Sequence, residues 1–302
     1  MGMKTVVWRL IFVIVMGLNV SGCAALSARS STTDTGEPWQ TIQNKGSDTM
    51  VNLALAWAEH YQSFRPEVRL AITGGGSGTG IAALINGTVD LANASRDIKP
   101  EEIAAAQENG IEPQEFIIAR DAIAIIVHPS NPVERLTLQQ LSDIYSGRIT
   151  NWRDVGGEDR PIVLLSRETN SGTHVYFLEA VVRMGDSSAR TLFSPDTLLL
   201  PSSEGIGEEV RHNPNAIGYD GLGYVTGDMK VISVALSDEG PFWLPSAETV
   251  DAGQYPISRN LYMYTAGTPT GAVAEYLEWI MGPEAQRIVL ELGFVPVAPV
   301  AP

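Results

Sequence analysis

Short apolar stretches alternate with amphipathic segments along most of the chain, which is the pattern of an α/β domain. Residues 51–64 place Ala54, Trp57 and Tyr61 at spacings of three and four, which predicts a helix. Residues 122–127 are almost entirely apolar, as in a strand buried on both faces. The same patterns predict further strands at residues 41–44, 68–73, 91–94, 162–165, 216–225, 231–236 and 262–264, and further helices at residues 81–86, 100–108, 136–145, 174–184 and 273–292.

The predicted elements divide into two lobes. Two extended segments, around residues 117–126 and 256–264, are candidate crossings between the lobes. A chain of 302 residues has the length of about two domains of ordinary size. We therefore predict that residues 39–120 and 256–302 form lobe I and that residues 121–255 form lobe II.

The N-terminus has the features of a targeting segment. Lys4 and Arg9 provide positive charge, and residues 10–18 form an apolar run. This run has the length of a signal-peptide hydrophobic region and is too short to span a bilayer. We predict a signal peptide over residues 1–22, which implies an extracytoplasmic protein.

The segment after the leader predicts a lipid anchor. Val20-Ser21-Gly22-Cys23 resembles the lipobox of bacterial lipoproteins, and Cys23 is the only cysteine in the chain. The alternative is an ordinary secretory leader followed by an incidental cysteine. Residues 23–38 are rich in Ser, Thr, Ala and Gly, which is typical of a flexible tether. We predict lipidation of Cys23 and attachment to a bacterial membrane, and a single cysteine excludes a disulfide within the chain.

The charge of the chain limits its partners. The formal net charge is −15 at pH 7, so nucleic acid and anionic lipid surfaces are poor partners. A protein of this charge that binds an anion needs a local positive site built from a few arginines and helix N-termini.

Three polar turns each follow a predicted strand and begin a predicted helix. Small residues let the backbone approach a ligand, hydroxyl groups donate hydrogen bonds, and a helix N-terminus adds unpaired N–H groups and the positive end of its dipole. Ser, Thr and Asp are also the preferred N-cap residues, so each turn alone is compatible with a simple cap. The candidate residues of the three turns are Ser47, Asp48 and Thr49; Ser77, Gly78 and Thr79; and Ser171, Gly172 and Thr173.

Two arginines strengthen the prediction of an anion site. Arg96 follows Ser95 at the end of the strand predicted at residues 91–94, and Arg167 stands four residues before Ser171. A guanidinium group at the carboxyl end of a strand reaches the crevice where α/β sheets bind ligands, and it can bind an oxyanion through two N–H groups.

The chain offers no convincing enzyme or cofactor motif. The glycine-rich run at residues 74–80 is not followed by Gly-Lys-Ser/Thr, and no suitable acidic residue completes a dinucleotide-binding motif. The four histidines show no metal-ligand or triad spacing. We predict a binding protein without cofactor or metal. The enzyme alternative, a secreted phosphatase or serine hydrolase using Ser47, Ser77 or Ser171, lacks a histidine partner.

From about Trp39 to its C-terminus, the chain resembles the phosphate-binding proteins of ABC-type importers. The resemblance rests on five segments in the same order: Lys45-Gly46-Ser47-Asp48-Thr49-Met50; Gly75-Gly76-Ser77-Gly78-Thr79-Gly80 with Leu84-Ile85-Asn86-Gly87; Asp90 with Ala94-Ser95-Arg96; Arg167 with Ser171-Gly172-Thr173; and Ala216-Ile217-Gly218-Tyr219. It implies the periplasmic-binding-protein fold, in which two α/β lobes joined by a hinge close on a ligand in the cleft between them.

The resemblance also implies roles for the candidate residues. Phosphate oxygens would be bound from one lobe by Thr49, Ser77 and Ser95, and from the other by Arg167 with the turn of Ser171, Gly172 and Thr173. It implies a monomer that delivers phosphate to importer permease subunits. Binding of another oxyanion, such as sulfate, molybdate or tungstate, is the alternative.

One position departs from the family pattern. Several members carry an acidic residue where this chain has Arg96, and that carboxylate accepts the proton of hydrogen phosphate. Asp48 is the nearest substitute in this chain, and Asp97 is the alternative. A carboxylate acceptor repels fully deprotonated sulfate and accepts a hydrogen bond from protonated phosphate.

Overall fold

The computed structural model describes residues 39–300. The predicted signal peptide at residues 1–22, the lipidation site Cys23 and the tether at residues 23–38 lie outside the described residues, and they stay predictions. In the part of the chain that is described, no helix combines the length and the apolar character needed to cross a membrane.

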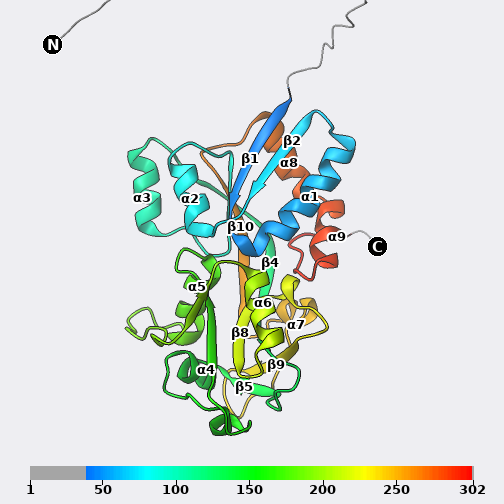
Figure 1. Cartoon of the computed structure of the whole chain (residues 1–302). Helices are drawn as coiled ribbons and strands as arrows, with labels where there is room; N and C mark the ends of the chain where they lie inside the picture. The colour runs from blue at the N-terminus through cyan, green and yellow to red at the C-terminus, as the bar shows by residue number, and fades with distance from the viewer. Residues whose placement is uncertain (1–38, 301–302) are drawn as a thin grey trace, which may run out of the picture. The chain divides into compact units, whose positions relative to one another are not determined.

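Lobe I is built on a mixed sheet, in the upper half of Figure 1. The strands β1, β2 and β3 are parallel, and β10 lies antiparallel between β3 and β4. Parallel neighbours need crossover connections, which the helices α1 and α2 provide. The bounds of these strands are β1 Gln40–Gly46, β2 Val68–Thr73, β3 Leu91–Ala94, β4 Gln114–Val127 and β10 Ser258–Thr265.

Helices cover both faces of the lobe I sheet (Figure 1). On one face, Trp57 and Tyr61 of α1 pack with Tyr276 of α8 in a buried aromatic core. On the other face, Ile81 and Leu84 of α2 pack against β3 and β10. The bounds are η1 Asp48–Met50, α1 Val51–Phe64, α2 Ser77–Ile85, α3 Pro100–Glu108, α8 Gly271–Ile280 and α9 Pro283–Glu291.

Lobe II continues the same sheet from the second half of β4. This half pairs antiparallel with β8 and β9, and the sheet extends through β6 to β7, while β5 pairs with β9. The bounds are β5 Arg135–Thr137, β6 Val163–Arg167, β7 Leu198–Leu200, β8 Ala216–Gly221 and β9 Lys230–Ala235.

The helices of lobe II enclose two cores. Tyr145 of α4 and Phe177 of α5 pack against Tyr219 of β8 in the larger core. Ile206 and Val210 of α6 cover the other face of the sheet. The bounds are α4 Leu138–Tyr145, η2 Trp152–Val155, α5 Gly172–Phe177, η3 Leu178–Val182, α6 Ser203–His212, η4 Leu222–Tyr224 and α7 Ala247–Asp251.

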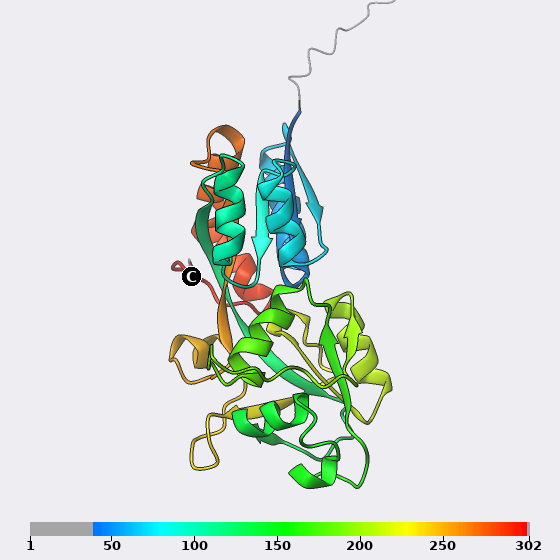
Figure 2. The same ribbon diagram turned by 90° about the vertical axis from the view of Figure 1, so that its left-hand side faces the viewer.

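The strands β4 and β10 pass from one lobe into the other, as Figure 2 shows. Along β4, Ile118 and Ala119 belong to the core of lobe I, whereas Ala122 and Ile123 belong to that of lobe II. The α/β prediction is confirmed. The exact lobe bounds stay a prediction, and the core changes close to the predicted division at 120/121.

Some predicted elements differ from those observed. The helix predicted at residues 273–292 is two helices, because Pro283 cannot donate a backbone hydrogen bond and disfavours helical geometry at Gly282. The strand predicted at residues 216–225 ends at Gly221, where the turn η4 begins. The helix predicted at residues 136–145 begins at Leu138, because the preceding residues belong to β5. The helix predicted at residues 174–184 begins at Gly172 and ends in the π-helical turn η3.

Candidate functional site

Hydroxyl groups from both lobes meet where the helices begin. Thr49, in the turn η1 just before α1, and Thr173, at the start of α5, have their Oγ1 atoms 2.7 Å apart. Ser77, the first residue of α2, accepts a hydrogen bond of 3.0 Å from the backbone N–H of Ser95, and the two hydroxyl oxygens are 3.3 Å apart. All four side chains are buried. The polar groups of the two lobes therefore contact one another directly.

Glycines allow the helix starts to come this close. A Cβ atom on Gly172 would stand 2.3 Å from Ser77 Oγ and 2.6 Å from Ser95 Oγ, on the opposite lobe. A Cβ atom on Gly76 would stand 2.8 Å from the carbonyl oxygen of Asn170, and Gly76 has a φ of +93° that favours glycine. Both positions therefore need glycine where lobe I meets lobe II.

The turn before α2 is bonded to lobe II through Asn170. The backbone N–H of Gly78 donates to the Asn170 carbonyl oxygen at 3.1 Å, and Asn170 Nδ2 donates to the carbonyl oxygen of Gly75 at 2.9 Å. The hydroxyl of Thr79 donates back to Gly75 at 2.6 Å. Gly78 and Thr79 thus form the edge of the lobe contact, beside the hydroxyl cluster.

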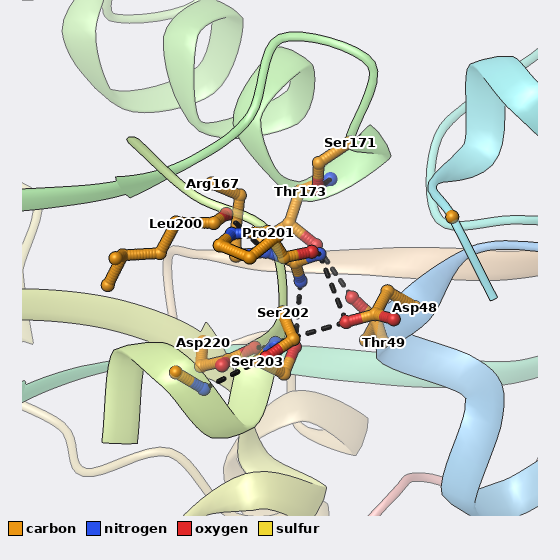
Figure 3. A network of polar contacts seen from close by, with 12 residues as sticks. Asp48, Thr49, Arg167, Ser171, Thr173, Leu200, Pro201, Ser202, Ser203 and Asp220 are labelled. Carbon is orange, nitrogen blue, oxygen red and sulfur yellow. Dashed lines mark hydrogen bonds and ion pairs between the residues drawn. The ribbon is translucent and has the colours of Figure 1, made fainter. Parts of the chain in front are cut away.

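Arg167 is a fully enclosed arginine at the end of β6, and only 1% of it is exposed. Its guanidinium group donates to Ser203 Oγ at 2.9 Å and to the carbonyl oxygen of Pro201 at 2.8 Å. It also forms an ion pair of 3.0 Å with Asp48 of lobe I. Figure 3 shows these contacts beside Thr49 and Thr173. Arg167 therefore joins the start of α6 to the start of α1.

Two carboxylates face this arginine from different lobes. Asp48 Oδ2 forms the ion pair with Arg167 and accepts a hydrogen bond of 3.0 Å from the backbone N–H of Ser203. Asp220, fully buried in lobe II, accepts the hydroxyl hydrogen of Ser203 at 2.8 Å. Burial raises the pKa of Asp220 to about 7, although the positive charge of Arg167 opposes this shift. Arg167 is thus ion-paired with Asp48 and connected to Asp220 through the hydroxyl group of Ser203.

Arg96 is held away from the hydroxyl cluster by an acidic partner. Its two terminal nitrogens donate to the carboxylate oxygens of Glu102 at 2.8 and 2.7 Å. Burial alone would raise the pKa of Glu102, but the Arg96 pair and the backbone N–H of Lys99 hold it below its usual value. Among the described residues, the buried Nε of Arg96 has no hydrogen-bond partner.

A third arginine, Arg259 of β10, lies beneath the hydroxyl cluster. It donates to Thr173 Oγ1 at 3.0 Å and to the backbone carbonyl of Ser95 at 2.9 Å, and its Nη2 is 3.4 Å from Thr49 Oγ1. Asp121 of β4 accepts two of its N–H groups. Burial raises the pKa of Asp121, although Arg259 opposes the shift. Arg259 and Asp121 contact the cluster from the crossing strands.

A cavity of about 420 Å³ adjoins the cluster on one side. It lies between the residues that follow β3, the helix α5 and the strand β10, and its wall includes Arg96, Asp97, Tyr176, Arg259 and Tyr262. Among residues 39–300, no group of three His, Cys, Asp or Glu side chains is arranged to hold a metal ion. The site therefore consists of hydroxyl groups and three arginines, and each arginine is paired with a carboxylate.

Comparison with known proteins identifies the family. A model of the PBP superfamily domain matches residues 27–284. The phosphate-binding protein PstS of Pseudomonas aeruginosa is 33% identical over 273 residues, which cover 85% of this chain and 83% of the relative. The PstS of Bacillus subtilis is 30% identical over 256 residues, covering 83% and 79% of the two chains. The chain belongs to the PstS family.

Solved structures agree with this assignment. A putative phosphate ABC transporter substrate-binding protein from Clostridium perfringens, with bound phosphate, is 32% identical and covers 85% of this chain and 100% of its own, with a TM-score of 0.76. An ABC-type phosphate transport receptor from Vibrio cholerae is 29% identical over 85% of this chain and 100% of its own, with a TM-score of 0.66. The resemblance and the two-lobed α/β fold predicted from the sequence are confirmed. As a PstS family member, the chain is a solute-binding protein and not an enzyme.

The structure gathers most of the candidate residues predicted for this PstS family member, and their roles in binding stay predictions. Thr49, Ser77, Ser95, Gly172 and Thr173 form the hydroxyl cluster and its contact. The remaining candidates lie around it: Asp48 and Arg167 are paired with each other, Ser171 accepts the N–H of Thr173 as the cap of α5, Ser47 precedes η1, and Gly78, Thr79 and Arg96 stand at the edge.

Sequence reasoning missed Arg259, Asp121 and Ser203 in this PstS family member. Arg259 and Asp121 stand in segments that were predicted to cross between lobes and that are otherwise largely apolar. A charged residue in each of two neighbouring buried strands is a signal for a buried ion pair. Ser203 carried no such signal, because its contact with Arg167 joins residues 36 positions apart.

Proposed function

We propose that this protein captures inorganic phosphate outside the cytoplasm and delivers it to the permease of an ABC-type importer. The observation that carries the proposal is the meeting of hydroxyl groups and helix starts from both lobes at Thr49, Ser77, Ser95 and Thr173. The relatives include phosphate-binding proteins and a solved structure with bound phosphate, which supports the choice of ligand.

The proposed site binds an anion mainly through oriented donors. Each of the three cleft arginines has a carboxylate partner, so the side-chain charges nearly cancel: Arg96 with Glu102, Arg167 with Asp48, and Arg259 with Asp121. Helix N-termini and hydroxyl groups supply hydrogen bonds and the positive ends of dipoles without net charge. This explains how a chain of net charge −15 can hold phosphate.

Titration calorimetry tests the proposed function. The mature protein is titrated separately with phosphate, sulfate, molybdate and tungstate, and a phosphatase assay is run beside it. We expect tight binding of phosphate, weak binding of the other anions and no hydrolysis. Tight binding of another oxyanion in place of phosphate would assign the same site to that ligand. Hydrolysis of a phosphate ester would contradict the proposal and support a phosphatase.

Lipidation of Cys23 gives the first prediction. We propose that the lipid holds the protein at a bacterial membrane, and that the segment before Trp39 separates the lipid from the site. Cys23→Ser should therefore release the protein into the soluble fraction while phosphate affinity stays unchanged. Detergent partitioning and calorimetry measure the two effects. Equal partitioning of the variant and the wild type would show that Cys23 carries no lipid.

Asp48 gives the second prediction. We propose that its carboxylate helps to select phosphate over sulfate and also holds the lobes together through Arg167 and Ser203. Asp48→Asn keeps the shape of the side chain but loses the charge. We expect phosphate affinity to fall about tenfold, which is the scale of one charge-assisted hydrogen bond, and sulfate to become a measurable competitor.

The control for Asp48 is the other candidate acceptor. Asp97 accepts the hydroxyl hydrogen of Tyr262 at the edge of the cavity. Asp97→Asn should leave the competition between phosphate and sulfate nearly unchanged, as calorimetry in the presence of sulfate measures. If sulfate competes as poorly in Asp48→Asn as in the wild type and gains only in Asp97→Asn, the selecting carboxylate is Asp97.

A further inference from the structure

Arg259 and Asp121 form a buried pair where both crossing strands change lobes. They are direct partners in the antiparallel register of β10 and β4. Arg259 is 7% exposed and Asp121 is fully buried. Ile257, just before β10, packs in the core of lobe II, and Leu261 of β10 packs in that of lobe I. The pair thus lies between the two cores, next to the hydroxyl cluster.

The guanidinium group of Arg259 contacts the proposed binding groups of both lobes. Its Nη2 donates to Thr173 Oγ1 of lobe II at 3.0 Å and stands 3.4 Å from Thr49 Oγ1 of lobe I. Its Nη1 donates to the carbonyl oxygen of Ser95 at 2.9 Å. Of the three cleft arginines, it is the one whose hydrogen bonds reach both threonine hydroxyls.

These contacts limit the directions in which the two hydroxyl groups can donate; in the described structure, one of the two threonine hydroxyls donates to the other. A hydroxyl carries one hydrogen and two acceptor lone pairs, while a guanidinium group can only donate. When Arg259 occupies a lone pair of Thr173 or Thr49, the hydroxyl hydrogen must point elsewhere. We infer that Arg259 is a positioning residue that presents the hydroxyl groups of Thr49 and Thr173 as donors to the bound anion, an inference that rests on the proposed function.

Asp121 holds this guanidinium group in place. Its Oδ2 accepts from Arg259 Nη2 at 2.8 Å and Nε at 3.2 Å, and its Oδ1 accepts from the backbone N–H of Leu222 at 3.2 Å. A Cβ atom on Gly221 would stand 2.9 Å from Asp121 Oδ2, so the neighbouring strand leaves the carboxylate little freedom. Asp121 also offsets the charge of Arg259, so Arg259 acts on the anion through the hydroxyl groups that it orients and not through a net positive charge.

A purely structural ion pair between β4 and β10 is the competing explanation, and a neutral double variant separates the two. Replacing a buried pair as a whole usually costs little stability, whereas removing one partner costs much. Arg259→Met with Asp121→Asn should therefore melt near the wild-type temperature. We expect its phosphate affinity, measured by calorimetry, to fall by at least about tenfold.

A second ion pair that involves β4 provides the control. Arg120, next to Asp121 on β4, pairs with Asp251 outside the cleft. Arg120→Met with Asp251→Asn removes an Arg–Asp pair that joins β4 to α7, is more exposed than the Arg259–Asp121 pair and contacts no proposed binding residue. Phosphate affinity should stay at the wild-type value in this control, which excludes a general effect of weakening the crossing strand.

A double-mutant cycle tests the positioning role itself and does not depend on the stability of the neutral pair. Arg259→Lys keeps the charge but loses the fork that reaches Asp121 and Thr173 together. It should cost about tenfold in phosphate affinity in the wild type and clearly less in Thr173→Val, where the Thr173 hydroxyl is absent and only the longer contact of 3.4 Å with Thr49 remains. Equal losses in both backgrounds, or wild-type affinity in the neutral pair, would overturn this inference and leave the proposed function intact. A wild-type protein that does not bind phosphate would overturn both.

Discussion

Gly172→Ala is expected to lower phosphate affinity by roughly a hundredfold while the protein stays folded. The added Cβ atom would stand 2.3 Å from Ser77 Oγ and 2.6 Å from Ser95 Oγ. These serines belong to the opposite lobe, so the methyl group keeps the lobes apart and does not disturb the core of either one. An overpacked contact costs about 1–3 kcal/mol, and the upper end of that range corresponds to about a hundredfold in affinity.

Stability and closure can be measured separately from affinity in this variant. Gly172 is the first residue of α5, where alanine is a better helix former, so the melting temperature should not fall. Small-angle scattering should show that phosphate compacts the wild type and not the variant. Gly227 is the matched control, because nothing lies within 4 Å of the Cβ atom that alanine would add there. Wild-type affinity in Gly172→Ala would mean that the lobes do not close through this contact.

Local patterns were sufficient to predict most of the fold. The spacing of Trp57 and Tyr61 along α1, and the apolar run that ends β4, follow directly from which faces are buried. The helices α6 and α7 were missed, because α6 contains two glycines and few apolar residues, and α7 is only five residues long. Packing against β8 stabilises α6 where its own sequence does not.

The sequence predicts those parts of the site in which neighbouring residues form one helix start. Each helix start can be recognised in the sequence from small and hydroxyl residues within a few positions. Thr49, Ser77 and Thr173 were therefore predicted as site residues. The hydrogen-bond and ion-pair partners of these residues lie far away in the sequence, so no local pattern predicts them. Arg167 was predicted to contact the ligand, and the structure adds that it binds Asp48, 119 positions earlier by sequence number (167 − 48), and the loop before α6.

The contacts of Arg167 lead to the second prediction with a large expected effect. Arg167→Ala should weaken phosphate binding between about tenfold and several hundredfold, since a charge-assisted hydrogen bond contributes about 1.5–3 kcal/mol. The loss has two sources. The cleft loses a positive charge, and Asp48 and Ser203 lose the group that joins the start of α1 to the start of α6. Arg167→Lys should recover only part of the affinity, because lysine lacks the fork that reaches Ser203, Pro201 and Asp48 together.

Arg167→Ala should also destabilise the protein, and this effect must be separated from binding. Without Arg167, the buried carboxyl group of Asp220 loses the nearby positive charge that opposes the rise of its pKa, and Ser203 loses a hydrogen-bond donor, so the folded state is less stable. Adding Asp220→Asn should restore much of the melting temperature without restoring phosphate affinity. Arg211→Ala, which removes a surface arginine paired with Glu208, should leave the affinity unchanged. Recovery of wild-type affinity in the Arg167→Ala, Asp220→Asn protein would show that Arg167 stabilises lobe II and takes no part in holding phosphate.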